Sequence, residues 1–184
     1  MSRRRVGIAA AAAAAAALGA YATASSGTVV SVSVRPLFTV TAPSGLDLGK
    51  LRVKETASGA IAVSVRANLA AGYRLTVSRT PVSVADSPIA LRIPNAPSGA
   101  TLDISPGGEV PIPPSGSVPV GRRTAGITPA AGGPWNGRLV VGPIAAGKPG
   151  ERTARVTFTA QAPARPTISA TVVVSLDVDN GKGH

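Results

Sequence analysis

The stretch ASGAIAVSVRANLAAGYRLTVSRT, residues 57–80, carries the clearest structural pattern in the chain. Apolar side chains alternate with small or polar ones over residues 61–66 and again over residues 73–78, and Asn68 to Gly72 interrupts the pattern. Period-two alternation places every second side chain on one face of a strand, so that one face packs and the other meets water. We predict two β-strands joined as a hairpin by a short turn.

The same alternation returns in other segments, and the connections between them contain many of the 21 glycines and 17 prolines. The predicted strands cover residues 28–41, 46–53, 89–93, 100–104, 118–127, 138–141, 151–161 and 167–178. Short strands with frequent turns favour an all-β fold. We predict an immunoglobulin-like antiparallel β-sandwich of about seven to nine strands, with an up-and-down barrel as the alternative.

The first 24 residues have the three parts of a secretory signal peptide. They comprise the basic Arg3-Arg4-Arg5, an apolar run over residues 6–18, and Ala22-Thr23-Ala24 as a cleavage motif. Cleavage after Ala22 and an uncleaved membrane anchor are the alternatives. We predict a signal peptide over residues 1–24, a single β-sandwich domain over 25–184, no transmembrane segment in the mature chain, and a secreted or cell-surface location.

Residues 105–119 form a segment rich in proline and glycine. Proline lacks the N–H group that a sheet ladder needs, so such a segment is extended or looped and cannot be a central strand. We predict a crossover between the two sheets here, and a polyproline recognition segment is the alternative.

The composition is poor in the groups that carry catalysis. The chain has no cysteine, eight acidic residues and one histidine, which is the last residue, His184. A thiol nucleophile and thiolate metal sites are excluded, and a chain end is a poor anchor for a catalytic triad. We predict a protein that is not an enzyme and that has no cofactor and no metal site.

The formal net charge of +11 arises from 19 basic against 8 acidic residues. These basic residues are dispersed along the sequence, and Arg122-Arg123 is the one adjacent pair after the signal. Nucleic-acid binders concentrate such charge and interleave aromatic side chains. We therefore predict no nucleic-acid partner, but loose contact with anionic polymers of the cell envelope.

Two sets of residues are candidates for contact with other molecules. Trp135 and Asn136 lie in a glycine-rich segment that predicts a tight turn, because Asn-Gly suits the positive φ angles of a hairpin. Trp135 is there either an exposed ligand anchor or a cover for the core. Val30, Val32 and Val34 form an alternating strand, which either pairs within its own sheet or assembles with a second copy or another envelope protein by β-augmentation.

Three motifs give the chain a family resemblance. They are LDLGKL at residues 46–51, GYRLTV at 72–77 and VTFTA at 156–160. In these motifs the chain resembles spore-coat-protein-U and pilin-like surface proteins and WxL-type cell-wall proteins. The resemblance implies an exported structural or adhesion component that acts through strand edges and loops. The alternative hypothesis is a binding module for an envelope polysaccharide or lipid that uses the loop around Trp135.

Overall fold

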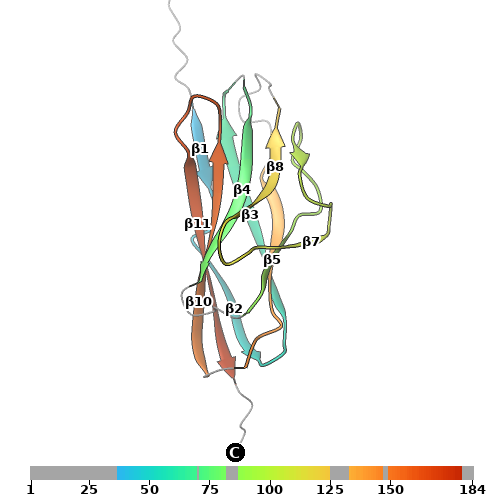
Figure 1. Cartoon of the computed structure of the whole chain (residues 1–184), viewed down its shortest axis with the longest axis vertical. Coiled ribbons are helices and arrows are strands. Elements are labelled where there is room, and N and C mark those ends of the chain that lie inside the picture. The colour runs from blue at the N-terminus through green and yellow to red at the C-terminus, as the bar shows by residue number, and fades with distance from the viewer. Residues whose placement is uncertain (1–36, 70, 82–86, 125–132, 147–148, 180–184) are drawn as a thin grey trace, which may run out of the picture. The chain divides into compact units, whose positions relative to one another are not determined.

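The computed structural model describes residues 37–69, 71–81, 87–124, 133–146 and 149–179, and the structural statements below refer to these residues. Every element in them is a strand (Figure 1). The strands are β1 (Phe38–Thr41), β2 (Gly45–Arg52), β3 (Ala57–Ala67), β4 (Tyr73–Pro81), β5 (Ile89–Arg92), β6 (Thr101–Leu102), β7 (Glu109–Pro111), β8 (Ser117–Arg123), β9 (Trp135–Val141), β10 (Gly150–Gln161) and β11 (Ile168–Asp179).

The strands form two sheets. One has the order β1-β3-β9-β5-β7, and the other has the order β2-β11-β10-β4-β8-β6. All neighbours pair antiparallel except β2 and β11, which are parallel. The predicted immunoglobulin-like antiparallel β-sandwich is confirmed. The described part of the chain has eleven strands, more than the seven to nine expected. The two-residue β6 falls within the strand predicted over residues 100–104, whereas the three-residue β7 was not predicted because it lies in the proline-rich segment.

The core lies between the sheets and is made by the alternation seen in the sequence. From Ile61 in β3, Ala154 in β10 and Val172 in β11 onward, every second side chain is buried while its neighbours are partly or fully exposed. The largest buried side chains come from both sheets: Trp135, Phe158, Leu75, Ile89, Leu91, Ile93, Ile112, Leu139, Ile144 and Leu176. Burial of one such aliphatic or aromatic side chain contributes about 1.5–3 kcal/mol, so these strands supply most of the stabilisation.

The predicted hairpin of β3 and β4 is wrong. The two strands lie in different sheets, where β3 pairs with β1 and β9 and β4 pairs with β8 and β10. Alternation indicates which side of a strand is apolar, but it is the same whether two strands form a hairpin within one sheet or an arch between two sheets. In the observed arch, β3 and β4 belong to different sheets and both contribute their apolar faces to the common core. Gly72 allows the change of direction, since its φ of 70° lies in the left-handed region.

The predicted glycine turn before residue 138 is also wrong in part. Trp135, Asn136 and Gly137 belong to β9, and Gly137 does not have a positive φ angle. Gly137 is required there because a side chain would not fit: a Cβ would lie 2.8 Å from the carbonyl oxygen of Arg92 on the neighbouring β5. Asn-Gly therefore marks a close approach of two strands rather than a hairpin.

The proline-rich segment 105–119 contains one short strand, β7, and the first residues of another, β8. β7 pairs with β5 at the edge of the five-stranded sheet, and β8 begins at Ser117 in the six-stranded sheet. Pro111 ends the edge strand β7, a position where its missing N–H costs no interior ladder bond. Ile112 then turns inward, is 2% exposed, and donates its N–H to the carbonyl of Ile89 at 2.8 Å.

Consecutive strands lie in different sheets except for β10 and β11, and residues 42–44 make the change from β1 to β2. Of the predicted first strand, only β1 is described, and Val30, Val32 and Val34 lie outside the described residues. Among the residues that the structure describes, no helix is long and apolar enough to cross a membrane.

Candidate anion-binding site

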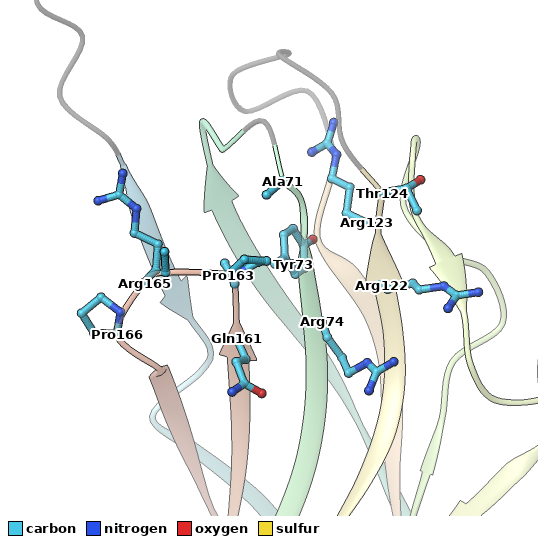
Figure 2. A pocket seen from close by; sticks show the side chains of 12 residues that line it. Ala71, Tyr73, Arg74, Arg122, Arg123, Thr124, Gln161, Pro163, Arg165 and Pro166 are labelled. Atoms are coloured by element: carbon cyan, nitrogen blue, oxygen red, sulfur yellow. The ribbon is translucent and has the colours of Figure 1, made fainter.

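A cavity of about 780 Å³ lies where three strands of the six-stranded sheet end (Figure 2). Its wall is built from the start of β4, the end of β8, the end of β10 and the loop that follows β10. The lining residues are Ala71, Tyr73, Arg74, Arg122, Arg123, Thr124, Gln161, Ala162, Pro163, Ala164, Arg165 and Pro166. The antiparallel order β10-β4-β8 brings together segments that are about 30 to 50 residues apart in the sequence.

Four arginines line this cavity, and no carboxylate does. Arg74 and Arg122 stand directly opposite each other on β4 and β8. Like charges in directly opposed positions repel each other in a sheet. Arg122 also faces Asp103, but Nε and Oδ1 are 3.8 Å apart and the Arg122 side chain is 53% exposed, so this ion pair is weak.

A β-bulge in β8 sets the directions of its two arginines. The register passes from Leu75 opposite Gly121 to Thr76 opposite Pro119, which leaves Val120 as an extra residue. Val120 and Gly121 are consequently both buried. A bulge shifts the inward and outward alternation by one residue. Arg122 is therefore exposed beside Arg74, whereas Arg123 is only partly exposed and stands opposite Tyr73.

The loop after β10 supplies the fourth arginine. The N–H of Arg165 donates to the carbonyl of Ala162 at 3.3 Å, and Ala164 between them has a left-handed φ of 53°. Pro163 and Pro166 restrict the rest of the loop, because their rings fix φ. In Figure 2 the side chain of Arg165 lies on one side of Pro163, and those of Arg74, Arg122 and Arg123 lie on the other.

Tyr73 joins the cavity to the core. Its side chain is 6% exposed, and its Oη accepts a hydrogen bond from Nε1 of Trp135 at 3.2 Å. Its ring also faces that of Phe38, with centroids 6.5 Å apart. Burial raises the pKa of Tyr73 above 10.0, while the Trp135 hydrogen bond and the positive charge of Arg123 act in the opposite direction. Tyr73 is thus a neutral phenol near pH 7.

The two residues predicted to bind a ligand differ in their surroundings. Trp135 is 1% exposed and packs under Gly121, whereas Asn136 is exposed on β9. The Trp135 ring covers the core, and its link to the cavity is indirect, through Tyr73. That Trp135 and Asn136 bind a ligand stays a prediction. The cavity itself was missed, although the adjacent pair Arg122-Arg123 was a local signal for it.

The chemistry available in the cavity is recognition of negative charge. Each guanidinium presents a rigid fork of N–H donors that pairs with two oxygens of a carboxylate or phosphate. Four such groups around one cavity suit a ligand with several negative charges. In the described ranges, no group of three or more His, Cys, Asp or Glu residues could hold a metal ion.

Comparisons with known proteins show no family. The chain matches no protein-family model and no curated protein sequence. Similar solved structures include the CupB6 tip adhesin from Pseudomonas aeruginosa, with 16% identity, a TM-score of 0.46, and coverage of 74% of this chain and 41% of that one. The CfaE adhesin of Escherichia coli has 10% identity and a TM-score of 0.41, with coverage of 78% and 49%.

A family 123 glycoside hydrolase from Clostridium perfringens is similar at the same level, with 14% identity, a TM-score of 0.43, and coverage of 77% of this chain and 28% of that one. The chain thus spans half or less of the length of these three proteins. At such identities and TM-scores, the likeness is confined to the β-sandwich architecture and does not indicate an activity. The resemblance seen in the sequence is supported at this coarse level only.

Proposed function

We propose that this chain is an exported, non-enzymatic adhesion component of the bacterial cell surface that binds an anionic envelope polymer in the arginine-lined cavity. The observation that carries the proposal is that Arg74, Arg122, Arg123 and Arg165 line one cavity that no carboxylate lines. This retains the sequence-based hypothesis of a binding module for envelope material, but moves its contact surface from the Trp135 loop to the ends of β4, β8 and β10.

The unliganded arrangement has an electrostatic cost that a ligand would remove. Arg74 and Arg122 are directly opposed on exposed positions, so their repulsion is modest and is screened by salt. A polyanion that bridges them replaces this repulsion by charge-assisted hydrogen bonds. We expect the affinity to fall as the ionic strength rises, because the contacts are close to solvent.

Trp135 provides a built-in reporter for binding. It is the only tryptophan of the chain, and it is hydrogen-bonded to Tyr73 in the cavity wall. A ligand that moves Arg123 or Tyr73 changes the polarity around this hydrogen bond. Titration of the full chain with oligogalacturonate or inorganic polyphosphate, followed by Trp135 emission and by calorimetry, therefore measures binding at this site.

The matched variants are Arg74→Gln with Arg122→Gln, and Arg66→Gln as the control. Arg66 is exposed on β3 in the other sheet and does not line the cavity. We expect the double variant to lose at least about tenfold in affinity, since each charged hydrogen bond contributes about 1.5–3 kcal/mol, and the control to lose little. Equal weakening per charge removed in both variants would mean general attraction by net charge, and would refute the cavity as the site.

A second candidate function is assembly through strand edges. β1 is the outer strand of its sheet and pairs with β3 alone among the described residues, and Leu37 before it is 44% exposed. We propose that residues 28–34, with Val30, Val32 and Val34, pair with a second copy or another envelope protein. Light scattering on the full chain and on Val32→Pro tests this. Proline blocks a ladder bond, so an oligomer should dissociate, and an unchanged mass excludes this strand.

A further inference from the structure

The outer face of the six-stranded sheet continues the arginine cavity as rows of side chains set by the strand register. The row nearest the cavity contains Arg122, Arg74 and Gln161 on β8, β4 and β10. The next two rows along the strands consist almost entirely of hydroxyl side chains. They contain Thr76, Thr159 and Ser169, and then Ser117, Ser78, Thr157 and Thr171.

These seven residues, called here the hydroxyl rows, point away from the core. They alternate with buried residues such as Val77, Phe158 and Val172, and each is partly or fully exposed. Neighbouring strands are about 4.8 Å apart and alternate residues along a strand about 6.8 Å apart. The four-member row is therefore about 14 Å long, and it lies two steps from the arginine row.

The hydroxyl groups differ from the arginines in what they recognise. A guanidinium only donates hydrogen bonds, whereas a Ser or Thr hydroxyl both donates and accepts. Thr157 and Thr171 show this directly, since their Oγ1 atoms are 3.0 Å apart and either can be the donor. A surface with both properties complements the hydroxyl groups of a sugar, which also donate and accept.

We propose that the polymer bound in the cavity is an acidic polysaccharide, and that its sugar rings continue from the arginine row onto the hydroxyl rows. This inference rests on the proposed function, because the arginines anchor the charged groups. The chain of sugars would lie along β4 and β10. The hydroxyl rows are continuous with the cavity and lie between the arginine row and Arg155, which occupies the next outward-facing position of β10 after Thr157. This arrangement favours a polymer that carries both carboxylates and ring hydroxyls.

The test removes hydroxyl groups without changing shape or charge. Thr76→Val, Thr157→Val and Thr159→Val are combined in the full chain, and Thr39→Val on the exposed face of β1 is the matched control. Valine is nearly isosteric with threonine and suits strands, and urea unfolding checks that the fold is kept. The probes are oligogalacturonate, which has ring hydroxyls, and inorganic polyphosphate, which has none.

We expect the triple variant to bind oligogalacturonate about tenfold more weakly, as for the loss of one or two neutral hydrogen bonds, and to bind polyphosphate as before. Equal affinity of the wild type and the triple variant for oligogalacturonate would overturn the inference. Binding of polyphosphate without oligogalacturonate would overturn it as well, but would leave the anion site intact. If Arg74→Gln with Arg122→Gln changes neither affinity, the proposed function itself fails.

Discussion

Replacement of Tyr73 by phenylalanine removes one oxygen atom between the arginine cavity and the core. That oxygen accepts the hydrogen bond from Nε1 of Trp135 at 3.2 Å, and the Trp135 side chain is 1% exposed. In Tyr73→Phe, the indole N–H stays buried without this partner. A buried donor without a partner costs about 1–3 kcal/mol. We expect the free energy of unfolding to fall by that amount, or Tm by about 2–4 °C per kcal/mol for a domain of this size.

The assay is urea unfolding followed by far-UV circular dichroism, because tryptophan emission itself changes in the variants. A double-mutant cycle with Trp135→Phe separates the hydrogen bond from the packing of the two rings. When both polar partners are removed, no buried donor is left without an acceptor. The loss in free energy of unfolding of the double variant should therefore be smaller than the summed losses of the two single variants, by about 1 kcal/mol or more. Losses that add to within about 0.3 kcal/mol would refute a structural role for this bond.

Three further outcomes follow from buried groups. Gly121→Ala should lose at least about 2 kcal/mol in urea unfolding, because its Cβ would clash with the Thr101 carbonyl oxygen and lie 2.6 Å from the Trp135 ring. Gly133→Ala should change the stability little, because open space surrounds that position. Burial raises the pKa of Tyr73 above 10.0, so the folded chain keeps a proton that the unfolded chain releases. Stability should therefore fall as the pH rises above 10.0, and Tyr73→Phe should lack this fall. Arg79, 8% exposed, donates through Nη1 to the Ser87 carbonyl at 2.9 Å but leaves Nε unpaired, so Arg79→Met should stay within about 1 kcal/mol of the wild type. A loss above about 3 kcal/mol would show that the charge is needed.

The sequence was sufficient for the long strands and their buried faces. Buried residues alternate with more exposed ones from Ala154 to Gln161 in β10 and from Val172 to Asp179 in β11, and a one-residue slip would expose the whole apolar set. The partition of strands between the sheets was not predictable in this way. β3 and β4 have the same kind of pattern whether they form a hairpin or an arch, and partners far along the chain decide between the two.

The arginine cavity depends on two features that no local pattern contains. One is the bulge at Val120, whose extra residue reverses the faces of Arg122 and Arg123. The other is the adjacency of β8, β4 and β10, which joins residues near 74, 122 and 161. Along the sequence these arginines are dispersed, and only the register of the sheet brings them together.

The strand order has a consequence for how the chain acquires its structure. β3 pairs with β9, β4 pairs with β10, and the six-stranded sheet has β10 and β11 near its middle. Neither sheet can close until the last third of the chain has left the ribosome, and pairing between such distant segments is slow. The core therefore stays incomplete during synthesis. A chain that stops before residue 150 lacks β10, which is the partner of β4 on one of its two edges. Folding is an event of the complete chain.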